Sequence, residues 1–190
     1  MADQMKELMT DQQWPADVLE KAAGIRLLAL DVDGIMTDGT LLFSASGDEL
    51  KGFNILDGLG IKQVMAAGIE VAVITGRCSP LTARRMNNLG IPHLMQGRED
   101  KKVALVELAG QLGLSPQQIA YMGDDLPDLP AIRYAGLGLT VPNGYWLVRQ
   151  HADICTSVPG GSGAVREACD LLLTACGQLE ATLQPYLEQN

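Results

Sequence analysis

Residues 27–39 read LLALDVDGIMTDG, an apolar run that stops abruptly at two carboxylates. The apolar residues 25–30 predict a strand that is buried on both faces. Asp31 and Asp33 follow at its end, and Gly34 permits a sharp turn. The two acids could simply open a turn, because Asp and Gly are common turn residues. They could also lie at the carboxyl edge of a parallel sheet, where open α/β folds bind their ligands.

Further along the chain, apolar and β-branched runs alternate with helical segments. Runs at residues 69–74, 119–122 and 136–141 predict more buried strands, and Ile154 could begin an edge strand. Because strands alternate with helices, the sequence predicts an α/β fold with a doubly wound parallel sheet, similar to a Rossmann fold. The helices that we expect lie at residues 57–67, across Arg84 to Gly90, at 99–112 and at 164–176.

One segment breaks this alternation. At residues 41–53, two short segments flank a Ser/Gly turn, which predicts a β-hairpin that protrudes from the sheet. The hairpin has the size of a small lid or a subunit contact, and the chain has too few residues for a cap domain. We therefore divide the chain into an arm (residues 1–24), one domain (25–176) and a tail (177–190).

The overall composition excludes several classes of protein. The chain has 190 residues and a formal net charge of −9, whereas a nucleic-acid-binding protein needs a basic face. No apolar run approaches the roughly 20 residues of a membrane span, and the N-terminal segment lacks the apolar core of a signal peptide. The four cysteines show no metal-binding spacing and suit a reducing compartment. We therefore expect a cytoplasmic protein without nucleic-acid or membrane partners.

Polar side chains stand where the predicted strands end. Asp31 and Asp33 follow the first strand, Thr75 the second and Asp124 the third. Because the carboxyl ends of parallel strands meet at one edge of a sheet, we expect these groups to lie close together. Gathered carboxylates repel one another unless a cation joins them, and an oxygen-only ligand set suits Mg²⁺. Lys101 adds a positive charge, so the set predicts phosphoryl transfer at a magnesium site.

These residues resemble, in order along the chain, the four motifs of haloacid dehalogenase-like phosphatases. The motifs are Asp31-Val32-Asp33-Gly34, Thr75, Lys101 and Gly123-Asp124-Asp125. Over residues 25–176 the sequence is more specifically similar to the 3-deoxy-D-manno-octulosonate 8-phosphate phosphatase family, whose members have no cap domain. The segments that carry this similarity are 30–39 (LDVDGIMTDG), 53–58 (FNILDG), 74–77 (ITGR), 123–130 (GDDLPDLP) and 160–167 (GGSGAVRE).

The resemblance implies a role for each motif residue. Asp31 would be the nucleophile that forms an aspartyl-phosphate. Asp33 would protonate the leaving alcohol and then activate the hydrolytic water. Mg²⁺ would be bound by the carboxylates of Asp31 and Asp124 and by the backbone carbonyl of Asp33. Thr75 and Lys101 would hold phosphoryl oxygens.

The resemblance also implies a substrate and an assembly. The substrate would be 3-deoxy-D-manno-octulosonate 8-phosphate, a sugar-acid phosphate of lipopolysaccharide precursor synthesis. The protein would be a homotetramer in which neighbouring subunits cover the active site, and the predicted hairpin fits such a contact. The positions that match the family's substrate-contacting residues are Asp33, Asn54, Ile55, Leu56, Asp57, Gly58, Lys62, Arg77, Arg85 and Lys101.

Some assignments stay open at this point. Asp125 and Asp128 could touch the metal or only support its ligands. The glycine-rich loop at residues 160–163 and the tail could act on their own subunit or on a neighbour. Ser162 stands where relatives commonly carry a basic residue, and Arg166 could take over that role or be an ordinary surface residue.

Three other functions are compatible with the same motifs. A phosphatase for a nonulosonate (sialic-acid-like) 9-phosphate would keep the chemistry and change the substrate. A non-catalytic interaction protein would keep only the fold, although the intact set of charged residues argues against it. A phosphomutase would have to shield its aspartyl-phosphate from water, which is difficult without a cap domain.

Overall fold

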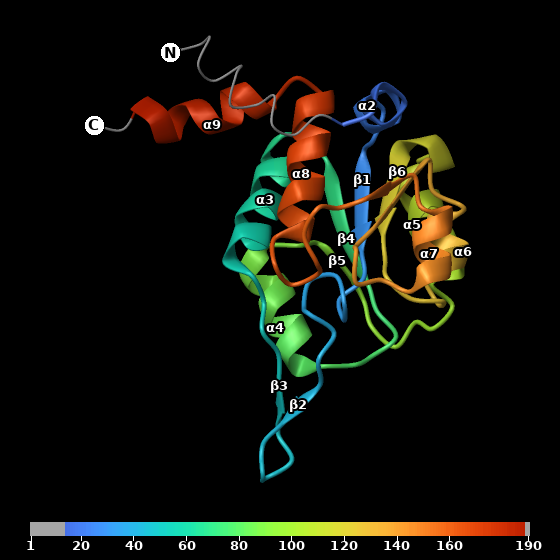
Figure 1. Cartoon of the computed structure of the whole chain (residues 1–190), viewed down its shortest axis with the longest axis vertical. Helices are drawn as coiled ribbons and strands as arrows, with labels where there is room; N and C mark the ends of the chain where they lie inside the picture. The colour runs from blue at the N-terminus through green and yellow to red at the C-terminus, as the bar shows by residue number, and fades with distance from the viewer. Residues whose placement is uncertain (1–13, 189–190) are drawn as a thin grey trace.

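Residues 27–30 form the central strand, β1 (Leu27–Leu30), of a six-stranded sheet in a computed structural model that describes residues 14–188 (Figure 1). All five pairings are parallel, and the strand order is β5-β4-β1-β6-β7-β8. This confirms the predicted parallel sheet. The other strands are β4 (Glu70–Ile74), β5 (His93–Met95), β6 (Ile119–Met122), β7 (Leu137–Thr140) and β8 (Ile154–Cys155).

The topology brings the ends of separate strands together. From β1 the chain builds outward through β4 and β5, then returns to the other side of β1 and continues through β6, β7 and β8. Leu30 pairs with Val73 on one side and with Met122 on the other. The residues that follow these strands therefore emerge at one edge, next to the point where the winding direction changes, as ligand sites of open α/β sheets do.

Helices cover both faces of this sheet (Figure 1). One face is covered by α3 (Ile55–Ala66), α4 (Pro80–Leu89) and α8 (Ala164–Ala175), with α2 (Ala16–Ala23) packed against α8. The other face is covered by α5 (Lys101–Leu112), α6 (Leu129–Ile132) and α7 (Trp146–His151). A short 3₁₀ turn, η1 (Pro116–Gln118), leads into β6.

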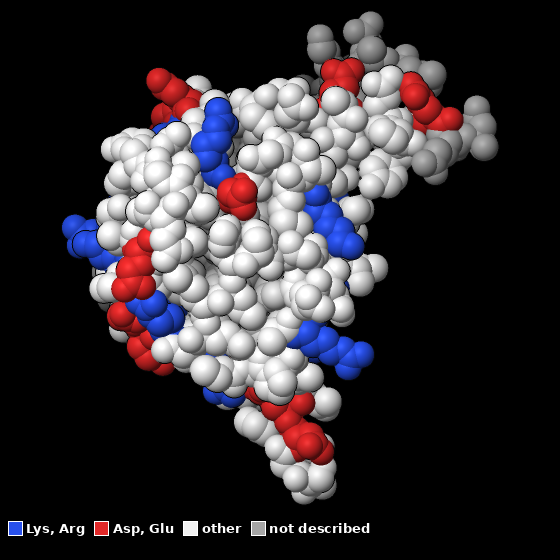
Figure 2. Space-filling view, turned by 180° about the vertical axis from the view of Figure 1, so that it is seen from behind, with Lys and Arg blue, Asp and Glu red and all other residues white. Residues whose placement is uncertain are grey.

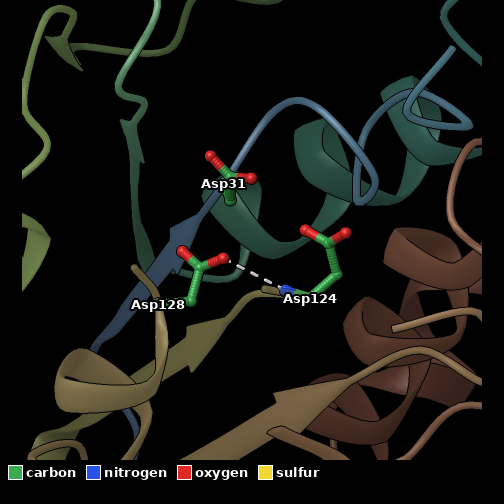
Figure 3. Close-up of side chains that lie close together, drawn as sticks. All are labelled: Asp31, Asp124 and Asp128. Carbon is green, nitrogen blue, oxygen red and sulfur yellow. Dashed lines mark hydrogen bonds between the residues drawn. The ribbon is translucent and has the colours of Figure 1, made fainter. Parts of the chain in front are cut away.

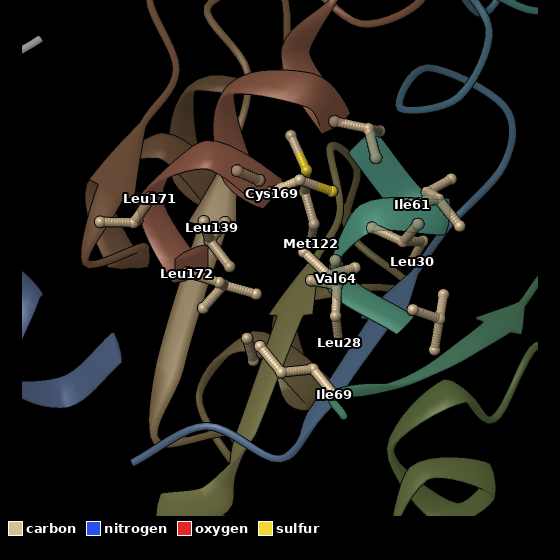
Figure 4. Packing of buried hydrophobic residues seen from close by; sticks show 14 of the residues in the cluster. Leu28, Leu30, Ile61, Val64, Ile69, Met122, Leu139, Cys169, Leu171 and Leu172 are labelled. Atoms are coloured by element: carbon tan, nitrogen blue, oxygen red, sulfur yellow. The ribbon is translucent and has the colours of Figure 1, made fainter. Parts of the chain in front are cut away.

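The hydrophobic core has two parts because successive strand side chains point to opposite faces of the sheet. Leu28 and Leu30 face α3 and α8, where they pack with residues such as Ile61 and Leu172 (Figure 4). Leu27 belongs to the second cluster, on the side of α5. Each fully buried Leu or Ile contributes roughly 1.5–3 kcal/mol through burial alone. The central strand is thus held from both faces.

The predicted hairpin is present. It consists of β2 (Leu42–Phe43) and β3 (Glu49–Leu50), which pair antiparallel and extend from the body of the protein beyond the carboxyl edge of the sheet (Figure 1). Its apolar side chains are exposed, and Phe43 is the most exposed at 61%. No cap domain occurs within residues 14–188.

Two local predictions differ from the structure, and two short helices were not predicted. Helix α3 begins at Ile55, two residues before the predicted start at Asp57, because the Asn54 side chain accepts a hydrogen bond from the Leu56 amide at 2.8 Å. The predicted tail contains a helix, α9 (Leu179–Glu188), whose first residue is buried against the core. The short helices α6 and α7 had no sequence prediction. Of the predicted arm, residues 1–13 lie outside the described residues.

Two features relate to the expectation that the protein has neither a membrane nor a nucleic-acid partner. None of the helices within residues 14–188 is both long and apolar enough to cross a bilayer. On the face shown in Figure 2, the basic side chains lie scattered and are interspersed with acidic ones.

Candidate active site

A group of buried charged side chains, here called the buried cluster, lies at the carboxyl edge of the sheet and consists of Asp31, Lys101, Asp124 and Asp128. Asp31 directly follows β1, Lys101 is the first residue of α5, and Asp128 immediately precedes α6. The Lys101 ammonium lies 2.8 Å from Asp31 Oδ1 and 2.7 Å from Asp128 Oδ1. The ammonium group of Lys101 thus joins two aspartates that are distant in sequence.

Asp128 organises this cluster. Its Oδ1 accepts hydrogen bonds from Lys101 Nζ and from the Tyr121 hydroxyl, both at 2.7 Å. Its Oδ2 accepts the backbone amides of Asp124 and Asp125, both at 3.2 Å. Because both oxygens are occupied and the residue is fully buried, Asp128 acts as an anchor for the loop that carries Asp124.

The Asp124 carboxylate has a different environment. It reaches from the loop after β6 toward Asp31 (Figure 3), and its Oδ1 is buried without a hydrogen-bond partner. Gly34, whose φ is +99°, allows this approach, because a Cβ at that position would collide with the Asp124 carboxylate. Asp125, by contrast, is exposed, and its Oδ1 accepts the Leu126 amide.

Burial and mutual repulsion shift the ionisation of the cluster. Burial, followed by repulsion from Asp128, raises the pKa of Asp31 to about 8 despite the opposing effect of Lys101. The same two causes raise the pKa of Asp124 to about 7. Burial works against the charge of Lys101, but the carboxylates of Asp31 and Asp128 outweigh it, so the pKa of Lys101 is raised. If all three of its carboxyl groups were ionised, the cluster would carry more negative charge than its one lysine compensates.

These residues fit a divalent cation. One carboxylate oxygen each of Asp31, Asp124 and Asp128 lie within 4.8 Å of one another. The buried Asp124 Oδ1 has a free lone pair, and a cation would relieve the repulsion that raises the two pKa values. An oxygen-only donor set of this kind suits a hard ion such as Mg²⁺.

All four predicted catalytic residues line one cavity of about 330 Å³. Thr75 is buried at its wall, and its Oγ1 accepts the Arg77 amide at 3.3 Å. The predicted residues that line this cavity are Asp31, Asp33, Thr75, Arg77, Lys101 and Asp124. The structure therefore brings together the residues proposed for metal binding, nucleophilic attack and phosphate binding.

A second set of charges, here called the hairpin network, lies beside the buried cluster and consists of Asp33, Glu49, Lys51 and Arg77. Lys51 Nζ contacts Asp33 Oδ1, and Arg77 Nε lies 3.7 Å from Asp33 Oδ2. Arg77 Nη2 donates to Glu49 Oε1 at 2.8 Å. Sequence reasoning missed Glu49, which lies in β3, and Lys51, which directly follows that strand.

The remaining predicted substrate residues lie elsewhere in this chain. Ile55, Gly58, Lys62 and Arg85 line a separate cavity of about 210 Å³ on the side of α3 and α4, which shares no lining residue with the first. Gly58 lets the Arg85 guanidinium lie against α3, where a Cβ would collide with it.

Two further predicted residues, Asn54 and Asp57, support the backbone in this chain. Asn54 caps the start of α3 through its carbonyl oxygen, and its amide donates to the Gly161 carbonyl at 3.3 Å. Asp57 is buried, and its Oδ1 accepts the Arg166 amide at 2.8 Å. The neighbouring Leu56 is exposed.

The glycine-rich loop packs on its own subunit. The Gly161 amide donates to the Ile35 carbonyl at 3.0 Å, and Gly160 lies so close to the Gly34 carbonyl that any Cβ would collide with it. Ser162 donates its backbone amide to Pro159. Arg166 pairs with Asp170 one helical turn away, at 2.8 Å, so its side chain is engaged within α8.

Comparisons with known proteins show the class to which this chain belongs. A family model for haloacid dehalogenase-like hydrolases matches residues 89–166. That segment contains the lysine and two of the aspartates of the buried cluster, on a fold of the corresponding type. Fold and site together thus define the class as haloacid dehalogenase-like hydrolases.

Closer relatives narrow the class. A 3-deoxy-D-manno-octulosonate 8-phosphate phosphatase from Escherichia coli K12 is 47% identical over 165 residues, 87% of this chain and 88% of that protein. The structure of a probable YrbI family phosphatase from Pseudomonas syringae is 49% identical, with a TM-score of 0.91 over 93% of this chain and 100% of that one. A Moraxella catarrhalis 3-deoxy-D-manno-octulosonate 8-phosphate phosphatase, solved with magnesium, phosphate and KDO, is 45% identical, with a TM-score of 0.88 over 90% of this chain and 98% of that one.

These likenesses extend over most of each chain. The protein belongs to the 3-deoxy-D-manno-octulosonate 8-phosphate phosphatase family, and it is a phosphoric monoester hydrolase.

Proposed function

We propose that this protein hydrolyses 3-deoxy-D-manno-octulosonate 8-phosphate to the free sugar acid and inorganic phosphate, with Mg²⁺, in the cytoplasm during lipopolysaccharide precursor synthesis. The observation that carries the proposal is the buried Asp31–Lys101 pair, which lines a cavity together with Arg77. A nucleophile beside a fixed cation suits a phosphoryl group, and a guanidinium suits the carboxylate of a sugar acid. The Moraxella catarrhalis relative, solved with magnesium, phosphate and KDO, supports the same assignment.

The proposed reaction has two steps, both at phosphorus. Asp31 attacks the phosphorus, the bond to the sugar oxygen breaks, and Asp33 gives its proton to that oxygen. Water then attacks the phosphorus of the aspartyl-phosphate while Asp33 takes a proton from it, which releases phosphate and restores both carboxyl groups. Lys101 and the Thr75 hydroxyl bind the phosphoryl oxygens, and Lys101 reduces the repulsion between Asp31 and its anionic substrate.

Mg²⁺ would be held by the carboxylates of Asp31 and Asp124 and by the backbone carbonyl of Asp33. When bound, it would neutralise and orient the phosphoryl oxygens. Asp128 would hold the Asp124 loop in place through the two backbone amides that it accepts.

The assembly that we propose is a homotetramer in which a neighbouring subunit completes the substrate site. Within one chain, the residues assigned to the substrate line two separate cavities, with Arg77 in one and Arg85 in the other. A second copy could bring its Arg85 cavity to the catalytic cavity of the first. The hairpin offers a contact surface, since the side chains of Leu42, Phe43 and Leu50 are exposed.

The substrate proposal is tested by phosphate release from a small panel of esters in the presence of Mg²⁺. The panel contains the proposed substrate, a nonulosonate 9-phosphate, common hexose phosphates and p-nitrophenyl phosphate. A strong preference in kcat/KM for the first supports the proposal, and a preference for the nine-carbon acid replaces it with that substrate. If phosphate is released from none of these esters, the alternative of a non-catalytic interaction protein is favoured instead.

Subunit mixing tests the assembly. Asp31→Asn and Arg85→Ala chains, each nearly inactive alone, are co-expressed with different tags and purified as mixed oligomers. If one site uses Asp31 of one chain and Arg85 of another, the mixed oligomers regain activity. If both residues serve the same chain's site, mixing restores nothing, and a monomer in light scattering would also contradict the assembly.

A further inference from the structure

Lys51, at the base of the hairpin, is almost completely buried although it carries a charge. Its side chain is 3% exposed, and it directly follows β3. A lysine is rarely buried to this extent without partners, because loss of hydration disfavours its charge. Here the ammonium contacts Asp33 Oδ1 and lies 3.8 Å from Glu49 Oε1. One of its partners is therefore the residue to which we assign proton transfer.

The contacts of Asp33 explain why this partner matters. Asp33 follows β1 on a loop, and its side chain is 22% exposed. One oxygen meets Lys51, and the other lies 3.7 Å from Arg77 Nε. The carboxyl group is thus oriented from two sides, by one cation from the hairpin and another from the loop after β4.

Glu49 ties the same two cations together. It accepts a hydrogen bond from Arg77 at 2.8 Å and another from the Ser79 hydroxyl at 3.0 Å. Positive and negative groups therefore alternate from Asp33 through Lys51 and Glu49 to Arg77. Displacement of the hairpin would pull Lys51 away from Asp33.

We propose that Lys51 is a positioning residue for proton transfer: through its contact with Asp33 it orients that carboxyl group toward the oxygen of the leaving alcohol. The inference rests on the proposed function, in which Asp33 protonates that oxygen. Proton transfer requires hydrogen-bond reach, and a misplacement of about 1 Å can cost roughly 100-fold in rate. Lys51 then links the position of the hairpin to the chemical step.

A change of leaving group separates this role from a purely structural one. A sugar alkoxide needs a proton as it departs, whereas p-nitrophenolate is a stable anion that does not. The value of kcat/KM covers the steps up to departure of the leaving group and leaves out the later hydrolysis, which is common to both substrates. A loss of positioning should therefore lower kcat/KM mainly for the sugar phosphate.

The experiment compares Lys51→Met, Lys51→Arg and the wild type as full chains with Mg²⁺. We expect Lys51→Met to lower kcat/KM about 30-fold or more for the sugar phosphate and less than about 3-fold for p-nitrophenyl phosphate. Lys51→Arg should recover part of the loss, because it keeps a cation next to Asp33. Lys21→Met is the matched control, since its ion pair with Asp153 is exposed and outside the site.

A double-mutant cycle with Asp33→Asn provides a second measurement. If Lys51 acts through Asp33, adding Lys51→Met to Asp33→Asn lowers kcat/KM no further. Equal losses for both substrates, or additive losses in the cycle, would overturn the proposal. Should Lys51→Met not fold, Lys51→Gln replaces it in the same comparison. A wild type inactive on every ester would instead refute the proposed function, so the two failures can be told apart.

Discussion

The buried cluster and the hairpin network lie side by side but are built in opposite ways. In the buried cluster, Asp31 and Asp128 are fixed at the ends of packed elements and share Lys101 beneath the surface. In the hairpin network, Glu49 lies in β3 and Lys51 directly follows it, and the hairpin consists of only two two-residue strands. The first set is preorganised by the core, whereas the second depends on one protruding segment.

This difference indicates how the protein divides its chemistry. Attack at phosphorus requires fixed charges in a site of low dielectric, which the end of a packed sheet provides. The proposed protonation and recognition of the leaving group use Asp33 and Arg77, whose side chains contact Lys51 and Glu49 of a hairpin with few supporting contacts. Segments of this kind open more readily than the core. The predictions below test that division, beginning with the largest effect.

Replacing the nucleophile should abolish activity without harming the fold. We expect Asp31→Asn to lower kcat by at least about 1,000-fold. Because burial raises the pKa of Asp31 to about 8, its charge is costly without metal, so the metal-free variant should melt at the same temperature or higher. The measurements are steady-state kinetics and thermal melting, with the exposed Asp17→Asn as control. A kcat within 10-fold of the wild type would contradict the nucleophile assignment.

Removing the anchor of the buried cluster should cost both stability and rate. Asp128→Ala leaves the Lys101 charge and the Tyr121 hydroxyl without their shared acceptor, and we expect a loss of about 3 kcal/mol in the free energy of unfolding. Displacement of the Asp124 loop should lower kcat about 100-fold. Denaturant titration and kinetics measure the two effects.

The matched control for that anchor lies on the hairpin. Asp48→Ala removes solvated hydrogen bonds to Ser44 and Ser46, and it should change the free energy of unfolding by less than about 0.5 kcal/mol. Equal losses in the free energy of unfolding from Asp128→Ala and Asp48→Ala would contradict the view that the core preorganises the buried cluster more than the hairpin.

The two regions should respond to pH in opposite directions. In the folded, metal-free protein Asp31 and Asp124 keep their protons up to about pH 8 and 7, whereas the unfolded chain releases them near 3.8. Their contribution to stability is therefore present in full below about pH 3.8, and it is lost progressively as the pH rises from there to 7–8, where the folded protein releases the protons. For Glu49, hydrogen bonding to Arg77 lowers the pKa, so its contribution is lost as the pH falls.

Thermal melting in EDTA and in Mg²⁺ measures the pH response of the buried cluster. We expect Mg²⁺ to raise the melting temperature more at pH 8 than at pH 6, because the ion binds the deprotonated carboxylates. EDTA should also remove activity, and added Mg²⁺ should restore it. A Mg²⁺ effect that is independent of pH would argue against these carboxylates as ligands.

A smaller effect than that of Asp128→Ala is expected at Tyr121, beneath the cluster. Tyr121→Phe removes one hydrogen bond to Asp128 while Lys101 and two amides remain, so we expect a loss of about 1 kcal/mol in stability. The value of kcat should fall only a few-fold. A loss as large as that of Asp128→Ala would mean that the hydroxyl, and not the lysine, is the main partner of Asp128.

Most of the fold could be predicted from local patterns. Apolar runs marked the central strands, and Gly90 was correctly expected to end a helix, since it follows α4 with a positive φ. Helix α3 was predicted to start too late because Asn54 was not recognised as its cap. Helix α9 was missed because the apolar contact that supports it, Leu179 against the core, depends on tertiary packing.

The residues of the site could be predicted only where they stand next to the ends of strands. Asp31 and Thr75 come directly after strands, and Asp124 follows another strand after one intervening residue, so the topology alone places them together. Glu49 and Lys51 were missed because no local pattern shows that the hairpin folds back on Asp33. Tyr121 looked like an ordinary strand residue, and its hydroxyl acquires a role only once Asp128 lies above it.

The strand order also determines when the active site can form during synthesis. The ribosome makes β1 early, but one of its two neighbours in the sheet, β6, is not made until residues 119–122. Until then, one edge of β1 has no partner, and an unpaired apolar strand edge tends to aggregate. The aspartates that share the site with Asp31 follow at 124 and 128. A nascent chain that stops before residue 119 thus contains Asp31, the proposed nucleophile, but lacks Asp124 and Asp128, so the proposed site can be complete only after residue 128 has been made.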